Sequence, residues 1–266
     1  MKNDPKLHDA THSIENKVIA NNATQNIYDD QSFFDGYRTL PRSVEGLAAA
    51  GEWESLRAML AAVEGRSVVD LGCGYGWFCR WAAEAGASQV LGLDVSEKML
   101  QQATADTDDA TIMYRRSDLE TLELPTGKFD LVYSSLTFHY LHNLPSVLRT
   151  VERALVPGGI VAFSVEHPIF TAPSSAGFVR NGDGHWSWPV DQYLVEGPRT
   201  TNWFVDGVVK QHRTIGTYVT LLLQAGLVLA HLDEWGPTDE QIEQHPNWAI
   251  ERERPPFLLM VGRKPG

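Results

Sequence analysis

The stretch Val68-Val69-Asp70-Leu71-Gly72-Cys73-Gly74-Tyr75-Gly76 indicates most about the fold of this chain. An apolar, β-branched run leads into three glycines at alternate positions, and residues of helical composition follow from 77 to 84. Glycines at such a turn allow positive φ and let a ligand approach the backbone. Asp70, two positions before the first glycine, places a carboxylate beside the turn, where it would attract a cation and repel a phosphate. The stretch therefore predicts a ligand-binding turn between a buried strand and a helix.

A glycine-rich turn of this type could bind a dinucleotide or a cofactor that lacks a pyrophosphate. Dinucleotide-binding folds use G-x-G-x-x-G/A, in which the third small residue allows close helix–strand packing and the helix N-terminus faces pyrophosphate. Here the third position is Trp77, and a bulky indole there argues against NAD or FAD. The pattern favours a cofactor without a pyrophosphate, and an NAD-dependent oxidoreductase stays open as an alternative.

Short apolar runs alternate with helical segments on both sides of this turn in the sequence. Continuous apolar runs of this length are typical of strands buried on both faces. The expected strands are 67–71, 89–94, 111–116, 129–133, 160–164, 227–232 and 257–261, and the expected helices are 77–84, 96–105, 144–155 and 214–224. This alternation predicts an α/β fold with a parallel sheet, right-handed crossovers and helices on both faces.

Two segments do not follow the alternation. Residues 1–65 are expected to form a tail and a helical lid, with helices around 44–50 and 53–62, and residues 166–212 form an insertion rich in aromatic side chains. Asn181-Gly182-Asp183-Gly184 within the insertion predicts a small hairpin. Ligands of open α/β sheets bind at the carboxyl ends of the strands, which both segments are placed to cover. Residues 66–165 are then the cofactor-binding core, and residues 213–266 complete the same domain.

The composition excludes several functional classes. The 266 residues carry 22 Lys plus Arg against 34 Asp plus Glu, a formal net charge of −12, which disfavours nucleic acid and anionic lipid as partners. The two cysteines, Cys73 and Cys79, cannot form a disulfide framework or a zinc cluster alone, so we expect no metal and a reducing compartment. No apolar run approaches the roughly 18 residues that span a bilayer. We therefore expect a cytoplasmic protein without a membrane partner, and the sequence leaves a homodimer open.

Further motifs, together with the glycine turn, resemble those of the class I S-adenosylmethionine-dependent methyltransferases over roughly residues 65–165. They are Leu93-Asp94-Val95-Ser96-Glu97-Lys98-Met99-Leu100, Arg116-Ser117-Asp118-Leu119, Phe129-Asp130-Leu131-Val132-Tyr133-Ser134-Ser135 and Leu155-Val156-Pro157-Gly158-Gly159. The resemblance implies the Rossmann-like fold of that class: a seven-stranded, mostly parallel sheet with the last strand antiparallel and helices on both faces. It also implies S-adenosyl-L-methionine as the cofactor and a small molecule as the methyl acceptor.

The same resemblance implies roles for individual residues. Asp94 would accept hydrogen bonds from both ribose hydroxyls, although its placement alone also fits a dinucleotide enzyme. Asp118 would meet the adenine amino group, and Asp70 would act on the ammonium of the methionine part, unless Asp70 only caps a turn. The other implied cofactor-binding residues are Gly72, Gly74, Gly76, Val95, Met99, Ser117, Leu119 and Ser134.

Three side chains are candidates for catalysis. Because methyl transfer from a sulfonium is an in-line displacement, positioning in a dry pocket can supply most of the rate, and a base is needed only if the acceptor loses a proton. His139 follows the third buried strand and His167 the fourth, and an imidazole pKa near ~6.5 suits proton transfer at neutral pH. Tyr28 resembles the lid tyrosine of small-molecule methyltransferases. The structural alternatives are packing for His139, orientation of the Pro168 turn for His167 and an aromatic staple for Tyr28.

The aromatic residues of the lid and the insertion indicate the kind of acceptor. Flat apolar walls with a few polar anchors are typical of ligand pockets. The candidate substrate-binding residues are Tyr37, Trp186, Tyr193, Arg199 and Trp203. We expect a planar or heteroaromatic metabolite that is methylated on nitrogen or oxygen, while a small core of the insertion's own is the alternative for several of these rings. A quinone-pathway C-methyltransferase and a non-catalytic S-adenosylmethionine-binding module stay open as other functions.

Overall fold

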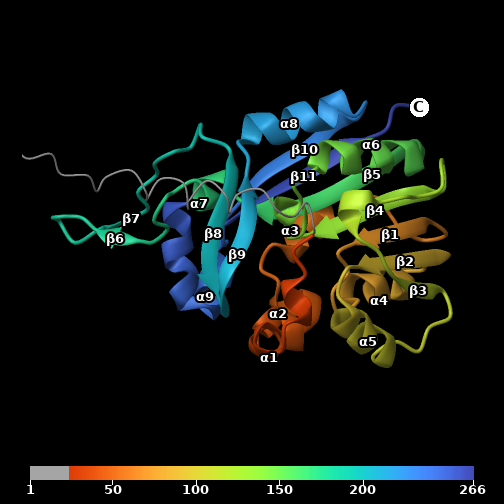
Figure 1. The fold of residues 1–266 in the computed structure, drawn as a ribbon, viewed down its shortest axis with the longest axis horizontal. Helices are drawn as coiled ribbons and strands as arrows, with labels where there is room; N and C mark the ends of the chain where they lie inside the picture. The colour runs from red at the N-terminus through yellow and green to blue at the C-terminus, as the bar shows by residue number, and fades with distance from the viewer. Residues whose placement is uncertain (1–23) are drawn as a thin grey trace, which may run out of the picture.

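A seven-stranded sheet forms the centre of the molecule, with strand order β10-β11-β5-β4-β1-β2-β3 (Figure 1). In the computed structural model, residues 24–266 are described, and the first part of the expected lid, residues 1–23, lies outside them. The strands are β1 (Ser67–Leu71), β2 (Gln89–Asp94), β3 (Ile112–Arg116), β4 (Phe129–Ser135), β5 (Leu155–Glu166), β10 (Val228–Trp235) and β11 (Phe257–Arg263). β11 is antiparallel to both of its neighbours, and the β1–β2, β1–β4, β2–β3 and β4–β5 pairs are parallel. The expected fold, with an antiparallel last strand, is confirmed.

Helices cover both faces of the sheet, as Figure 1 shows. α6 (Leu144–Ala154) and α8 (Ile215–Gln224) lie on one face, and α4 (Trp77–Glu84) and α5 (Glu97–Ala105) lie on the other. All four helices were expected, and their ends agree with the expectation to within one or two residues. β5 begins earlier than expected, because Pro157-Gly158-Gly159 lies inside the strand at a shift of its register with β4.

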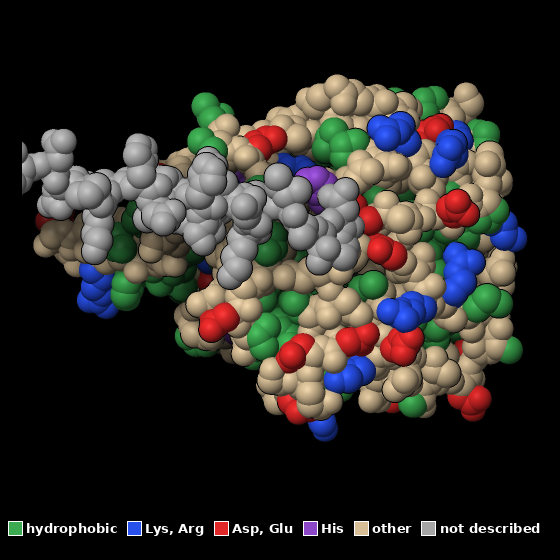
Figure 2. Space-filling view, viewed as in Figure 1, with side chains coloured by type: hydrophobic (Ala, Val, Ile, Leu, Met, Phe, Trp, Pro, Cys, Tyr) green, Lys and Arg blue, Asp and Glu red, His purple; other side chains and the backbone are tan. Residues whose placement is uncertain are grey.

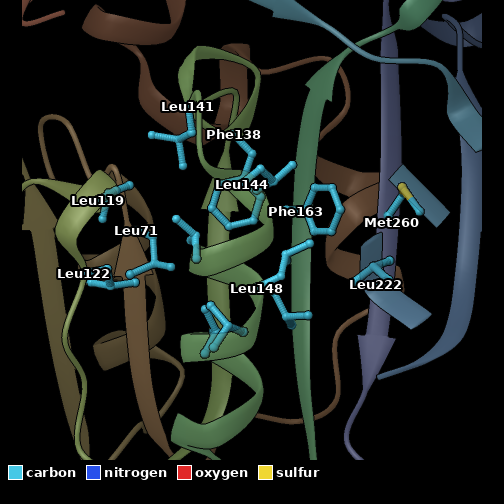
Figure 3. Packing of buried hydrophobic residues seen from close by; sticks show 14 of the residues in the cluster. Leu71, Leu119, Leu122, Phe138, Leu141, Leu144, Leu148, Phe163, Leu222 and Met260 are labelled. Carbon is cyan, nitrogen blue, oxygen red and sulfur yellow. The ribbon is translucent and has the colours of Figure 1, made fainter. Parts of the chain in front are cut away.

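The larger apolar core lies between the sheet and the helices α6 and α8. Figure 3 shows side chains of α6 such as Leu144 and Leu148 facing Leu71 of β1 and Phe163 of β5. Val147, Leu148 and Val151 recur at helical spacing, so a single stripe of α6 is buried. This packing fixes the strands whose carboxyl ends form the site.

The N-terminal segment consists of short helices. They are the 3-10 turn η2 (Ile27–Asp29), α1 (Gln31–Tyr37), α2 (Pro41–Val44), the 3-10 turn η3 (Gly46–Ala49) and α3 (Trp53–Ala58). The helix expected around 44–50 is interrupted, since Gly46 has φ +65° and packs directly on the indole of Trp77, where a Cβ would overlap the ring. The helix expected over 53–62 ends at Ala58.

The insertion consists of α7 (Pro168–Thr171) and two small hairpins. These are β6 (Val179–Arg180) with β7 (Trp186–Ser187), and β8 (Gly197–Trp203) with β9 (Val205–His212). The first hairpin turns at the expected tetrapeptide, where Asn181 Oδ1 accepts the N–H groups of Asp183 and His185. Two further helical segments that were not expected, α9 (Asp239–Gln244) and the 3-10 segment η6 (Pro246–Glu253), connect β10 to β11.

The surface mixes charges of both signs. On the part of the face in Figure 2 that belongs to the described residues, Asp and Glu side chains are interspersed with Lys and Arg. None of the helices within residues 24–266 is both long enough and apolar enough to cross a bilayer.

We predict that Phe163→Ala lowers the free energy of unfolding by about 3–5 kcal/mol, because it removes a fully buried ring that packs on Phe138 in the core. Urea unfolding measures this loss. The control is Met113→Ala on the edge strand β3, where the side chain is 60% exposed and a change within about 0.5 kcal/mol is expected. Equal losses for the two variants would contradict the description of the core.

Candidate functional site

A cavity of about 1120 Å³ lies at the carboxyl ends of the parallel strands. Its wall includes Asp70 from β1, Asp94 from β2 and Glu166 from β5, together with Tyr28 from the N-terminal segment and Trp203 from the β8–β9 hairpin. Ligand pockets usually measure about 300–1,000 Å³, so this volume can hold a nucleoside cofactor and a small second molecule together. The lid and the insertion both contribute to the wall, as expected from their places in the sequence.

The glycine turn between β1 and α4 forms one part of the wall. Gly72, Gly74 and Gly76 all have positive φ, at +82°, +51° and +73°. A Cβ at Gly72 would overlap Thr137, and one at Gly76 would overlap Tyr114, whereas nothing lies within 4 Å of a Cβ at Gly74. Gly72 and Gly74 line the cavity, but Gly76 does not, because it packs against Tyr114 as the N-cap of α4. Gly76 is therefore a structural glycine in this turn.

Asp94, the last residue of β2, is bonded on both oxygens. Its Oδ2 accepts the N–H of Gly74 at 2.9 Å, and its Oδ1 accepts the N–H of Ser96 at 2.9 Å. Burial raises the pKa of Asp94, while the backbone N–H groups oppose that shift. Val95 and Met99, the two apolar residues expected near the adenine ring, line the cavity beside it.

Asp70 lies 2% exposed in the cavity wall. The thiol of Cys79 donates to its Oδ2 at 3.6 Å, and burial raises the pKa of Asp70 to about 8. Neither Asp70 nor Asp94 belongs to any of the ion pairs found within residues 24–266. A cation that entered the cavity beside Asp70 would supply the partner that the protein itself does not provide.

The N-terminal segment is attached to the start of α5, directly after Asp94. Asp29 Oδ1 accepts the Ser96 hydroxyl at 2.6 Å and the N–H of Lys98 at 3.2 Å. A carboxylate at a helix N-terminus is stabilised by the unpaired N–H groups and the helix dipole. Asp29 therefore connects the lid to the loop that carries Asp94.

Besides Gly76, three residues expected at the cofactor lie outside the cavity lining: Ser117, Asp118 and Ser134. Asp118 accepts the Thr24 hydroxyl at 2.6 Å and caps the 3-10 turn η4 (Leu119–Thr121), while Leu119 itself lines the cavity. The hydroxyl of Ser134 is buried and donates to the carbonyl of Leu71 at 2.7 Å. The side chains of Asp118 and Ser134 thus have partners within the protein.

Aromatic rings form the wall on the side of the lid and the hairpin. Tyr28 meets Tyr37 edge-on at 5.2 Å between centroids and Tyr140 at 6.5 Å, and Tyr37 meets Trp203 at 6.1 Å. All four line the cavity. Burial raises the pKa of Tyr28 well above its usual value, so its phenol stays protonated and is a poor base.

His139 lies in the 3-10 turn η5 (Phe138–Tyr140) and lines the cavity. Burial, with the nearby charges of Lys210 and Arg213, holds its pKa well below the usual value, so the ring is neutral. Its Nδ1 accepts the N–H of Glu166 at 3.3 Å. Because an amide N–H can only donate, the ring proton is on Nε2, and His139 presents a hydrogen-bond donor there rather than a base.

His167 lies outside the cavity lining, in contrast to the expectation that it could act as a base. Its Nδ1 accepts the N–H of Ile169 at 3.0 Å and caps α7, and its Nε2 lies 2.9 Å from Glu234 Oε1. Both ring nitrogens are therefore engaged. The structure agrees with the alternative that His167 orients the Pro168 turn.

The expected substrate residues Trp186, Tyr193 and Arg199 also lie outside the cavity lining. The Trp186 ring is 40% exposed on the β6–β7 hairpin and stacks with Arg180. Tyr193 packs edge-on against His212, and the Arg199 guanidinium donates to backbone carbonyls of the insertion. These side chains make their contacts within the insertion itself.

Three ion pairs in the wall were missed by the sequence analysis. Arg42 binds both oxygens of Glu52, the closer at 2.8 Å, Lys210 Nζ lies 2.5 Å from Glu166 Oε1, and Arg254 lies 2.7 Å from Glu251. Glu166 ends β5, so the rule that singled out strand ends also applied to it. Lys210 lies 44 positions from Glu166 and Arg42 lies ten positions from Glu52, whereas Arg254 and Glu251 are only three positions apart. The described residues contain no group of three or more His, Cys, Asp or Glu side chains that could hold a metal ion.

Comparison with known proteins identifies the family. Residues 69–163 match a family model described as a methyltransferase domain. The solved structure of an S-adenosylmethionine-dependent methyltransferase from Mesorhizobium loti is 53% identical, with a TM-score of 0.81 over 82% of this chain and 100% of that chain. A second structure, named a putative S-adenosylmethionine-dependent methyltransferase from Listeria monocytogenes, is 36% identical, with a TM-score of 0.75 over the same shares.

A malonyl-[acyl-carrier protein] O-methyltransferase from Erwinia pyrifoliae is 43% identical over 98 residues, which are 36% of each chain. That match therefore leaves most of both chains unaligned. The two solved structures align over their full length with most of this chain. The chain belongs to the S-adenosylmethionine-dependent methyltransferases.

Proposed function

We propose that this methyltransferase acts on a nitrogen or oxygen atom of a small planar molecule. The observation that carries the proposal is the aromatic wall formed by Tyr28, Tyr37, Tyr140 and Trp203 beside the glycine turn. Flat rings bind between such side chains by offset or edge-on contacts. A covered pocket of this kind fits a metabolite better than a protein surface.

The cofactor would occupy the side of the cavity formed by β1 and β2. The open space above Gly74 allows close approach to the backbone, and the ionised form of Asp70 would pair with the ammonium of the methionine part. Asp94 would bind the ribose hydroxyls, with Val95 and Met99 against the adenine ring. When bound, S-adenosylmethionine supplies a methyl group on a positively charged sulfur.

The charges of the cavity wall argue against an anionic acceptor. Arg42, Lys210 and Arg254 are the three cations of the wall, and each is already paired with a carboxylate. A carboxylate acceptor would therefore bring a second negative charge to a cation that already has one beside it. The malonyl-[acyl-carrier protein] O-methyltransferase match, which covers 36% of each chain, supports only the shared methyl-transfer core.

The side chains around the acceptor would mainly position it and exclude water. Oriented reactants in a dry site can account for much of a methyl transfer without a reacting side chain. His139 would orient the acceptor by donating from Nε2, and Tyr28 and Trp203 would cover the site.

The acceptor proposal is tested with labelled S-adenosylmethionine and a panel of neutral nitrogen and oxygen heteroaromatics, aromatic carboxylates, carbon acceptors and acyl carrier protein. We expect transfer to a neutral nitrogen or oxygen acceptor. For that acceptor, Trp203→Ala should raise KM about tenfold through loss of a stacking wall, whereas the matched Trp186→Ala outside the cavity should not. Transfer only to carboxylates, carbon or the carrier protein would refute the proposal.

For the cofactor, we predict that Asp94→Ala weakens S-adenosylmethionine binding by about 1–3 kcal/mol, because hydrogen bonds to a charged group are lost. Titration calorimetry measures the change. Asp130→Ala is the control: Asp130 pairs with Arg66 and does not line the cavity, so its loss should leave affinity unchanged. An unaltered affinity for Asp94→Ala would contradict the ribose assignment.

We also predict that cofactor binding releases a proton from Asp70 below pH 8. Burial raises the pKa of Asp70 to about 8, so at pH 6.5 the free protein holds the carboxyl proton, and pairing with an ammonium favours the ionised form. Calorimetry at pH 6.5 in two buffers of different ionisation enthalpy counts the protons. The Asp70→Asn variant should release fewer protons and bind more weakly; equal release by both proteins would contradict this.

The raised pKa of Asp70 also makes the stability of the cofactor-free protein depend on pH. The unfolded chain loses the Asp70 proton near pH ~4, whereas the folded protein keeps it until about pH 8. The protonation of Asp70 therefore makes its full contribution to the free energy of unfolding below pH ~4, and this contribution is lost as the pH rises toward 8. Asp70→Asn should flatten this part of the stability profile.

A further inference from the structure

A buried carboxylate oxygen in the cavity wall lacks a partner. Glu166 Oε1 is bound to Lys210 Nζ at 2.5 Å, but Oε2 is buried and accepts no hydrogen bond within the structure. Burying an unpaired carboxylate oxygen is costly, and native structures nearly always satisfy such atoms. Because Glu166 lines the cavity, the bound acceptor is the natural source of the missing donor.

We propose that Oε2 of Glu166 receives the proton of the methyl acceptor, and that the acceptor is an uncharged heteroaromatic ring with an N–H or O–H group. This inference rests on the proposed function and adds to it a catalytic residue and a substrate class. During the reaction the acceptor nitrogen or oxygen bonds to the methyl carbon as the carbon–sulfur bond breaks. The electron pair of that bond stays on sulfur, and the acceptor proton moves to Glu166.

The other polar groups near the acceptor are less suited to this role. Both oxygens of Glu52 are taken by Arg42, and Glu251 is paired with Arg254. His139 presents a donor. Burial holds the tyrosine phenols of the wall in the protonated form by raising the pKa values of Tyr28 and Tyr140.

The environment of Glu166 affects how strongly this carboxylate binds a proton. Burial raises its pKa, and the positive charges of Lys210 and Arg254 oppose that rise. Neutral His139 and the phenol of Tyr140 are the other titratable groups of the wall nearby. A raised pKa makes an ionised carboxylate a stronger base than an ordinary exposed one.

The balance of charge around this carboxylate argues for an uncharged acceptor. The charged residues of the cavity wall are Arg42, Glu52, Asp70, Asp94, Glu166, Lys210, Glu251 and Arg254. Asp70 and Asp94 lie on the cofactor side, and the rest form three pairs. The acceptor side therefore carries equal numbers of positive and negative groups.

Two hydrogen-bond donors in the cavity wall lack partners, which indicates that the molecule receiving the methyl group also carries an atom that accepts hydrogen bonds. Trp235 Nε1 and Arg254 Nε are both buried without a partner, and both residues line the cavity. Trp235 pairs with Phe257 of β11, which pairs with Glu166 of β5, so these three residues form one row across the sheet edge. Neighbouring strands are about 4.8 Å apart, so the row spans about 10 Å, a length suited to a ring system with a donor and an acceptor at opposite ends.

The test titrates benzimidazole, 1-methylbenzimidazole and benzoate at pH 8 into the protein saturated with S-adenosylhomocysteine. Benzimidazole carries an N–H, its methyl derivative does not, and benzoate is an anion. We expect benzimidazole to bind at least about tenfold more tightly than the other two, since only it satisfies Oε2, a difference of about 1.4 kcal/mol. If benzimidazole does not bind, or binds no more tightly than the other two compounds, the proposal is overturned. This result would hold regardless of the binding measured for variants of the protein.

In Glu166→Gln the amide oxygen is held by Lys210, so the amide NH₂ would face the cavity and the preference for benzimidazole should disappear. Glu234→Gln is the matched control, because Glu234 pairs with His167 outside the cavity lining and its change should keep the preference. Retention of the preference in Glu166→Gln would refute the role of this carboxylate.

Turnover separates this inference from the proposed function. For the best nitrogen or oxygen acceptor of the panel, Glu166→Gln should lower kcat by about 100-fold or more while the KM for S-adenosylmethionine stays the same. Undiminished turnover would overturn the Glu166 proposal alone. If no nitrogen or oxygen acceptor of the panel is methylated, the proposed function is overturned. The preference for benzimidazole over 1-methylbenzimidazole would still test whether Glu166 Oε2 binds the N–H group.

Discussion

The carboxylate of Asp94 is the interaction on which the geometry of the site depends. It accepts the N–H of Gly74 in the glycine turn and the N–H of Ser96 at the start of α5, so one side chain fixes two backbone segments. The hydroxyl of Ser96 donates in turn to Asp29 of the lid. The turn, the helix and the lid are thus held by one chain of hydrogen bonds.

Some charged groups of the cavity wall have a partner of opposite charge, and others do not. Arg42, Lys210 and Arg254 are each neutralised by a carboxylate, which lowers the cost of burying them. Asp70 has no such partner, and burial raises its pKa to about 8. A buried acid held partly protonated can gain a full charge when a cation arrives, so the protein needs no permanent counter-ion at that place.

The sheet and the helices around it could be predicted because their signals are local. Apolar runs, the spacing of Val147, Leu148 and Val151 in α6 and the Asn-Gly turn at 181–184 each lie within a few residues. The break at Gly46 could not be predicted in this way, since its cause is contact with Trp77, thirty-one positions later in the chain. Tertiary contact overrides local propensity at such a position.

The candidate site could be predicted more completely in the glycine turn and at the strand ends than in the segments that cover them. Gly72, Gly74 and Asp70 follow from the strand-to-turn pattern, and Asp94 follows from the resemblance of its motif to those of the methyltransferases. The structure brings these four residues together in one wall. Neighbouring residues at the end of a strand face opposite directions, so the sequence could not decide between Glu166 and His167. The aromatic composition of the insertion likewise did not reveal that Trp203 faces the cavity and Trp186 faces solvent.

Trp77 has two roles that constrain each other. Its indole occupies the position where dinucleotide-binding proteins need a small residue, and the same ring is the surface on which Gly46 of the lid segment packs. A substitution that shortened this side chain to make room for a longer cofactor would also remove the ring on which Gly46 of the lid segment packs. A change of this one side chain would therefore affect both the cofactor turn and the attachment of the lid.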